Sequence, residues 1–206
     1  MGGDITAWLQ LVTILYLWRK PTMNKTTNNV IYLVHGAVIA ALYVVLTALA
    51  AGFDLASGAI QVRFSECLTI LPYFTPAAIP GVTIGCIISN IFFGGALPDV
   101  IFGSLATLIG AIGTYMLRKN RFLCSLPPVI SNAVIIPFVL KYAYGFDGSF
   151  DLLGIHISTL PAFVLTVGAG EIITCVLFGQ ILISALMPVR RYIFGTDFEA
   201  VKKKDK

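Results

Sequence analysis

A carboxylate inside an apolar run is the most informative chemical feature of this sequence. Glu171 lies within Val167-Gly-Ala-Gly-Glu-Ile-Ile-Thr174, well inside the last long apolar stretch. A charged side chain at the centre of a bilayer costs about 2.5 kcal/mol or more on insertion scales. We therefore expect Glu171 to face a bundle interior, where it takes up a proton, binds a ligand or pairs with a structural partner such as Lys141.

Other polar residues accompany the apolar segments earlier in the chain. Arg63 and Glu66 are three residues apart, so they can pair on one helical face or form the wall of a site. Asp99 precedes another apolar run, where it can cap a helix or bind a ligand. Ser104 follows shortly after it beside a glycine, a position typical of helix packing as well as of ligand contact.

Two amides and several aromatic residues complete the set. Asn90 and Asn132 can each bridge two helices or read the edge of a heterocycle. Tyr142 can stack on a ring, although aromatic residues are also common at membrane interfaces. Such a set suits a planar ligand that is rich in donors and carries positive charge, whereas an anionic ligand would need clustered arginines or free helix N-termini. The candidate substrate-binding residues are Glu171, Asp99, Glu66, Asn132, Asn90, Arg63, Ser104 and Tyr142.

Composition identifies the environment of these residues. The chain has 206 residues, of which 57% are hydrophobic and 12% charged, whereas soluble domains average roughly 25% charged residues. This is an integral membrane protein with room for roughly five to seven spanning helices and no separate enzyme domain. The net charge of +4 sits in a few clusters, which indicates membrane topology and not nucleic-acid binding.

Metal and disulfide chemistry are not expected. The cysteines are scattered, form no C-x-x-C pair and have no zinc-type spacing to a histidine. Those within apolar runs are expected to act as small hydrophobic residues. The four cysteines are Cys67, Cys86, Cys124 and Cys175.

Six apolar segments are expected to span the membrane, which predicts an all-α six-transmembrane-helix bundle. Prolines at 72, 76 and 80 predict kinks or a short broken helix in and beside the second segment. Residues 145–154 are expected to form a loop. The expected spans are 30–51, 67–79, 82–93, 100–117, 127–144 and 160–187.

The positive-inside rule orients this bundle. Basic residues before the first span, at 118–121 and after the last span fall on one side if there are six spans, so both termini are expected to be cytoplasmic. Residues 1–22 are interpreted as an N-terminal extension, or as an interfacial helix. Residues 23–190 form the membrane domain and 191–206 a basic cytoplasmic tail.

Several sequence blocks together resemble the QueT family, over about residues 30–187. These are the S-components, or substrate-binding subunits, of energy-coupling-factor (ECF) transporters, which are implicated in uptake of queuosine precursors such as preQ1. The blocks are Arg63-Phe-Ser-Glu66-Cys-Leu-Thr, Thr75-Pro-Ala-Ala-Ile-Pro-Gly81, Ile84-Gly-Cys with Asn90, Asp99-Val-Ile-Phe-Gly-Ser-Leu-Ala-Thr107, Ile130-Ser-Asn-Ala133 and Gly170-Glu171.

The resemblance implies six helices, cytoplasmic termini, a bacterial plasma-membrane location and an outward-facing site. It also gives a role to Ala37 and Ala41, one helical turn apart, which from the pattern alone can serve internal packing or close approach of another helix. In S-components such small residues contact the transmembrane T-component. Two partner ATPases would hydrolyse ATP, since this chain has no phosphate-binding loop motif; no cofactor is expected on the chain itself.

For the ligand that the resemblance implies, we hypothesise that Glu171 and Asp99 divide recognition of its ammonium and guanine-like edge, assisted by Glu66, Asn132 and Asn90. Two alternatives stay open. One is a stand-alone secondary transporter of a cationic small molecule, which uses Glu171 as a proton or cation site. The other is an S-component for a different vitamin-like substrate. The sequence contains no catalytic motif that would favour an enzyme.

Overall fold

The computed structural model describes residues 25–52, 63–94, 97–145, 150–152 and 155–194. The chain divides into two compact units, Met1–Leu33 and Val34–Lys206. Of the first unit, residues 25–33 are described, and they form the beginning of helix α2. The predicted extension at 1–22 lies outside the described residues, as does most of the predicted basic tail at 191–206.

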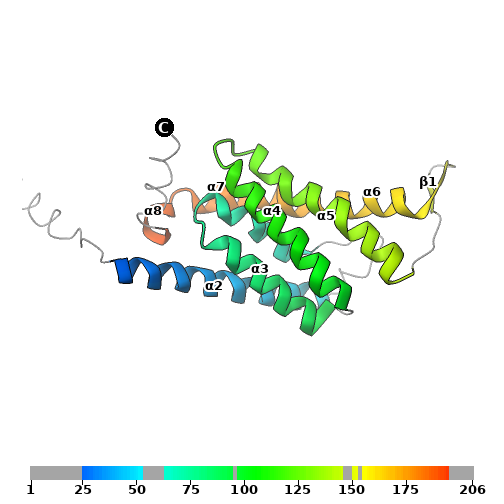
Figure 1. The fold of residues 1–206 in the computed structure, drawn as a ribbon. Coiled ribbons are helices and arrows are strands. Elements are labelled where there is room, and N and C mark those ends of the chain that lie inside the picture. Colours follow the sequence, from blue (N-terminus) through cyan, green and yellow to red (C-terminus); the bar gives the residue numbers. More distant parts are fainter. Residues whose placement is uncertain (1–24, 53–62, 95–96, 146–149, 153–154, 195–206) are drawn as a thin grey trace, which may run out of the picture. The chain divides into compact units, whose positions relative to one another are not determined.

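Helices make up nearly all of the described chain (Figure 1). In the second unit α4 packs against α3 and α5, and α5 packs against α6. Several helices change their hydrogen-bonding pattern along their length, from α-helical to π-helical. The α-helices are α2 (Lys25–Gly52), α3 (Ala78–Ser89), α4 (Ser104–Met116), α5 (Leu126–Phe138), α6 (Thr159–Glu171), α7 (Gly179–Leu186) and α8 (Arg190–Ile193).

Shorter elements join or extend these helices. Two are 3₁₀ helices, η1 (Phe64–Tyr73) and η4 (Leu123–Ser125). Four are π-helical segments: η2 (Asn90–Gly94), η3 (Asp99–Gly103), η5 (Val139–Ala143) and η6 (Ile172–Phe178).

The membrane character of the chain is confirmed, while the count of six spans stays a prediction. Four helical stretches in the described chain are long and apolar enough to cross a bilayer: Asn29–Gly52, Asp99–Met116, Leu123–Ala143 and Thr159–Leu186. Ala78–Phe93 is a shorter apolar helix. The side of the membrane on which each terminus lies also stays a prediction.

The second expected span is a broken helix, and part of an expected loop is a hairpin. The second expected span, 67–79, is a ten-residue 3₁₀ helix with Pro72 inside it, followed by the start of α3 at Ala78. This agrees with the expected broken helix, because each proline removes a backbone donor. Part of the expected loop at 145–154 is instead a hairpin, in which β1 (Phe150–Leu152) pairs antiparallel with β2 (Ile155–Ile157).

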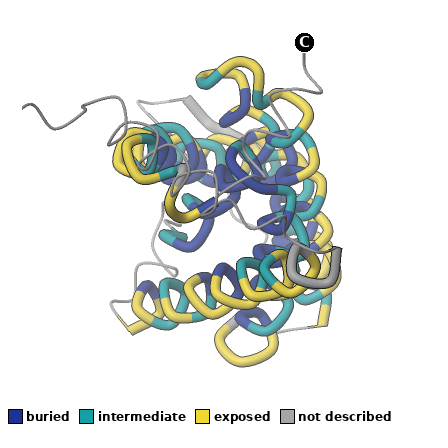
Figure 2. Tube along the Cα trace, turned by 90° about the vertical axis from the view of Figure 1, so that its left-hand side faces the viewer, coloured by how far each residue is buried: buried dark blue, intermediate teal, exposed yellow. Residues whose placement is uncertain are grey.

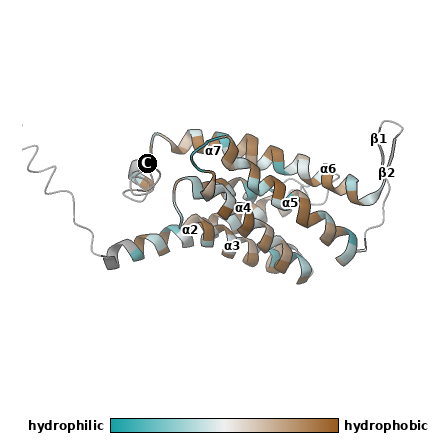
Figure 3. Ribbon diagram, turned by 45° about the horizontal axis from the view of Figure 1, so that its top comes forward, coloured by the Kyte–Doolittle hydropathy of each residue, from teal (hydrophilic) through white to brown (hydrophobic). Residues whose placement is uncertain are grey.

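Many exposed residues of the helices are hydrophobic; Figure 2 colours each residue by its burial and Figure 3 by its hydropathy. Phe92, Leu165 and Ile181 are each more than half exposed. The interior, in contrast, holds many buried hydroxyl, amide and carboxyl groups beside its apolar core. Such a distribution fits a bundle whose exterior faces lipid and whose polar groups must be satisfied internally.

Helices α2 and α3 approach each other at glycine positions. A Cβ atom added at Gly85 would lie 2.7 Å from Cβ of Tyr43 and 2.9 Å from the carbonyl oxygen of Ala40. Internal packing of α2 therefore uses Ala40 and Tyr43, while Ala37 and Ala41 are exposed. The exposed pair stays available for a partner helix.

Substitution Gly85→Ala should destabilise the bundle. Its methyl group must displace backbone atoms of α2, and overpacking of this kind typically costs about 1–3 kcal/mol. We expect a lower melting temperature for the detergent-purified variant. Gly168→Ala is the matched control, because its Cβ would meet Ala133 at an ordinary 3.7 Å. Equal melting temperatures for the two variants would contradict the close approach.

Candidate ligand-binding site

Glu66 is a buried carboxylate whose two oxygens differ in their hydrogen bonding. It lies in the first turn of η1 and is 2% exposed. Its Oε1 accepts hydrogen bonds from the Tyr43 hydroxyl, at 2.5 Å, and from the Thr107 hydroxyl, at 3.4 Å. Its Oε2 is buried and has no partner of hydrogen-bonding geometry in the described part of the chain. An open acceptor in this position can receive a donor from a ligand.

Glu171 is joined to Glu66 by a thiol and an amide. It ends α6 and is 7% exposed. The Cys175 thiol donates to Oε2 of Glu171 at 3.2 Å and lies 3.5 Å from the main-chain oxygen of Glu66. The side chain of Asn132, on α5, interacts with both carboxylates. The structure thus brings three predicted site residues from three elements into one buried cluster.

Asp99 forms a second polar group together with Asn90. The Tyr144 hydroxyl donates to Oδ2 of Asp99. Asn90 donates its amide to the main-chain oxygen of Asp99 at 3.0 Å and to the Cys86 sulfur at 3.4 Å. The residue at the cap position of this helix is Pro98, so Asp99 does not act as the N-cap. Asn90 bridges η2 and η3 in this arrangement.

Arg63 supplies positive charge near these groups. It precedes η1 and interacts electrostatically with Tyr43, Glu66 and Asp99. It makes no direct ion pair with a carboxylate of the described residues. The predicted pairing of Arg63 with Glu66 is therefore a longer-range electrostatic interaction and not a contact. Lys141 is not placed at Glu171; its ammonium lies 5.6 Å from the ring centre of Tyr142.

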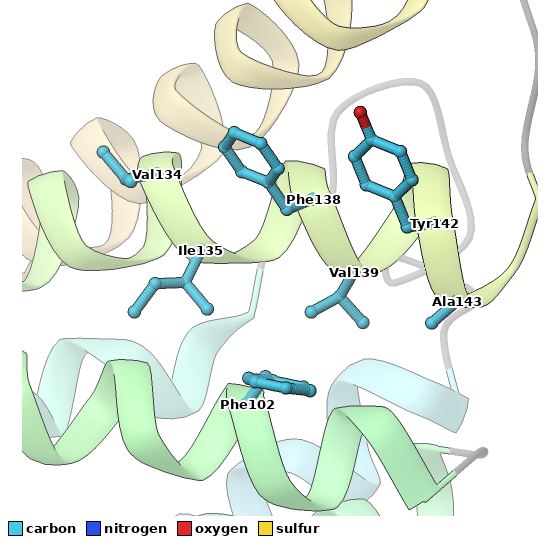
Figure 4. A pocket seen from close by; sticks show the side chains of 7 residues that line it. All are labelled: Phe102, Val134, Ile135, Phe138, Val139, Tyr142 and Ala143. Atoms are coloured by element: carbon cyan, nitrogen blue, oxygen red, sulfur yellow. The ribbon is translucent and has the colours of Figure 1, made fainter.

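The remaining two candidates differ in position. Ser104 begins α4, is buried, and has a hydroxyl oxygen without a partner in the described chain. Tyr142 is 71% exposed and lies outside the polar cluster. It lines an apolar surface groove between η3 and α5–η5, together with Phe102 and Phe138 (Figure 4). Tyr144, two residues later, is the tyrosine that reaches Asp99.

Three candidates coincide with changes in helix type. Asn90 and Asp99 are the first residues of π-helical segments, and Glu171 directly precedes another. π-Helical turns occur frequently at functional sites because they displace side chains from the α-helical register. The polar groups of all three meet neighbouring elements.

Sequence reasoning missed three members of the cluster, namely Tyr43, Thr107 and Cys175. Tyr43 carried a usable signal, because it shares a helical face with Gly36 and Ala40 at spacings of seven and three. Cys175 was interpreted as a small hydrophobic residue, yet its thiol donates to Glu171. Nothing in the local sequence distinguishes it from the other buried cysteines.

Comparison with known proteins gives the family. A model of the QueT transporter family matches residues 33–188, which include every candidate site residue. The chain belongs to the QueT transporter family. Within this family the "Queuosine precursor transporter QueT" of Lactococcus lactis subsp. cremoris (strain MG1363) is 45% identical over 73 residues. That match covers 35% of this chain and 43% of the relative. No solved structure matches the chain.

Membership in the QueT transporter family agrees with the membrane character expected from the sequence. The family is one of transporters, which agrees with the expectation of a membrane protein. The helices long enough to cross a bilayer make the chain a multi-pass membrane protein. The roles of the individual site residues stay predictions.

The contact between Tyr43 and Glu66 should stabilise the fold. Tyr43→Phe keeps the ring but leaves Oε1 of Glu66 with Thr107 alone. A lost hydrogen bond to a buried charged group typically costs about 1–3 kcal/mol, so the melting temperature in detergent should fall by several degrees. Tyr192→Phe, at a position 92% exposed, is the control. A variant as stable as the wild type would show that this hydrogen bond contributes nothing.

Proposed function

We propose that this chain is the substrate-binding S-component of an ECF-type importer and captures a queuosine precursor such as preQ1. The observation that carries the proposal is the buried cluster of Glu66, Glu171 and Asn132, in which Oε2 of Glu66 has no partner among the described residues. The name of the Lactococcus lactis relative supports the class of substrate.

The charge balance of the cluster favours a cationic ligand. Each carboxylate accepts its hydrogen bonds from neutral groups: Tyr43 and Thr107 at Glu66, Cys175 at Glu171, and Tyr144 at Asp99. Such donors orient a carboxylate without neutralising it. Arg63 offsets part of this charge from a distance. A ligand that brings a positive charge therefore gains a favourable charge-assisted contact.

The chemistry of preQ1, 7-aminomethyl-7-deazaguanine, fits these groups. A carboxylate can accept two hydrogen bonds from the adjacent N–H and amino groups of a guanine-like edge, while a second carboxylate neutralises the primary ammonium. We assign these two roles to Glu171 and Asp99, with Glu66, Asn132 and Asn90 assisting. Ser104, whose hydroxyl is open in the described chain, is a further contact.

Burial of the carboxylates implies a gated site. Glu66, Asp99 and Glu171 are each less than a tenth exposed. A ligand can reach them only when a covering segment moves, and closure over the ligand would then exclude water and strengthen polar contacts. Ligand binding and conformational change are therefore linked, as a carrier that delivers its ligand requires.

Energy for uptake would come from partner subunits. The sequence contains no phosphate-binding loop motif, so ATP hydrolysis is assigned to two partner ATPases that act through a transmembrane T-component. The exposed residues Ala37 and Ala41 of α2 form the proposed contact with that component. Small side chains at one-turn spacing permit close helix–helix approach within a bilayer.

Two other functions remain to be tested against this proposal. A stand-alone secondary transporter would use Glu171 as a proton or cation site and would support uptake without ATPases. An S-component for a different vitamin-like substrate would keep the partner requirement but not the preference for preQ1. Uptake assays in cells with and without the partner subunits separate the first alternative from the rest.

Titration calorimetry of the purified chain tests the ligand assignment. Wild type should bind preQ1 more tightly than guanine, which lacks the ammonium. Glu171→Gln and Asp99→Asn should each weaken preQ1 binding about tenfold or more, the effect of losing one charge-assisted hydrogen bond. Lys119→Gln removes a charge at an exposed position and should leave affinity unchanged. Unchanged affinity in both carboxylate variants would refute the assignment.

Bulky residues on the exposed face of α2 test coupling. Ala37→Leu and Ala41→Leu should strongly reduce ATP-dependent uptake, because they prevent close approach of the partner helix, while preQ1 affinity of the isolated chain stays the same. Ala51→Leu adds the same side chain at another exposed alanine of α2 and serves as the control. Normal uptake in both test variants would place the coupling surface elsewhere.

A further inference from the structure

A second groove on the surface of the bundle has a charged end. It has a volume of about 490 Å³, and its walls are mostly apolar. Unlike the similarly sized groove around Tyr142, which no charged side chain lines (Figure 4), it contains an arginine. Its main lining residues are Arg121, Ile172, Val176, Leu177, Gln180 and Ile181.

The guanidinium of Arg121 is fixed in place by α7. Its Nε donates to Oε1 of Gln180 at 2.9 Å, and its Nη2 donates to the main-chain oxygen of Gln180 at 3.1 Å and to the Ser184 hydroxyl. Gln180 is held in turn, because its amide donates to the main-chain oxygen of Arg121 at 2.7 Å and to the Ser125 hydroxyl at 2.8 Å. The arginine is therefore preorganised before any ligand arrives.

This arrangement leaves positive charge and donors for a ligand. All the acceptors that Arg121 contacts are neutral, and its Nη1 group donates to no residue of the described chain. Arg121 lines the groove and is only partly buried. None of the carboxylates Glu66, Asp99 and Glu171 lines the groove. The groove can thus offer two N–H donors and a full charge to an anion.

The position of Arg121 matches the depth of lipid headgroups. The residue lies between two candidate spans, Asp99–Met116 and Leu123–Ala143. The apolar walls belong to the span Thr159–Leu186, within hydrocarbon depth. Twelve α-helical residues would extend about 18 Å, and the stretch from Ser184 to Ile172 extends somewhat less because part of it is π-helical. This is about half of the roughly 30 Å hydrocarbon core. An acyl chain of one leaflet has the same reach.

We propose that this groove binds an acidic phospholipid, with the phosphodiester on Arg121 and an acyl chain along Ile172, Val176 and Leu177. Arginine suits a phosphate because its planar fork can donate two parallel hydrogen bonds. A zwitterionic lipid should bind less tightly, since no carboxylate in the described chain lines the groove to accept its ammonium group. Free phosphate gains less as well, because the apolar walls contribute only when acyl chains fill them.

Native mass spectrometry of the full-length chain in neutral detergent tests this site. Phosphatidylglycerol and phosphatidylcholine with identical dioleoyl chains are titrated against each other, with glycerol phosphate as the headgroup-only probe. We expect phosphatidylglycerol to be retained several-fold more than phosphatidylcholine, and glycerol phosphate not to compete. Arg121→Gln should reduce the preference for phosphatidylglycerol about fivefold or more, as loss of a charge-assisted hydrogen bond predicts.

Two control variants test whether the lipid binds in this groove. Lys119→Gln removes the same charge from the same loop, at an exposed position, and should retain the preference. Val176→Trp fills the apolar wall and should weaken binding of both lipids. Wild type without a preference, an equal loss in Lys119→Gln, or unchanged lipid retention in Val176→Trp would each overturn the proposal. Competition by glycerol phosphate would also overturn it and assign the site to a soluble phosphate compound. If the protein bound neither of the two lipids, the proposal would be wrong and a protein segment would be the expected occupant.

Discussion

The structure depends on one constraint, namely that carboxylates in a membrane interior must be held by other polar groups. At Glu66 and Glu171 these groups are hydroxyls, a thiol and an amide from several helices. Since each contact joins different elements, satisfying the carboxylates also fixes how η1, α2, α4, α5 and η6 meet. The acidic cluster is in this sense both a ligand site and a part of the core.

The membrane class and most helix locations could be predicted from the sequence, because apolar runs of about 20 residues have few alternatives in a bilayer. The expected break near Pro72 is present as a 3₁₀ helix. The hairpin at Phe150–Ile157 was not expected, since two short strands within a glycine-containing loop leave only a weak pattern.

The site could be predicted in kind but not in detail. Intramembrane acidic and amide residues indicated which side chains matter, and the structure brings Glu66, Glu171 and Asn132 together. The direction in which each side chain leaves its helix was the part that the sequence could not predict. In the π-helical segment Val139–Ala143 the repeat is longer than in an α-helix, so counting by 3.6 residues cannot tell that Tyr144 faces Asp99 while Tyr142 is exposed. The spacing of Tyr43 from Gly36 and Ala40 indicated its helical face, but the contact of its hydroxyl with Glu66 depends on tertiary packing.

The glycine contacts between α2 and α3 have a mechanical consequence. Where a methyl group would already collide with backbone atoms at Gly85, the two helices have no slack across which to slide. They can be expected to move as a single rigid body, because bending within the pair would break many tight contacts at once. Any movement that opens the buried carboxylates must then take place outside this pair, and a force on the outer face of α2 would be passed on to α3.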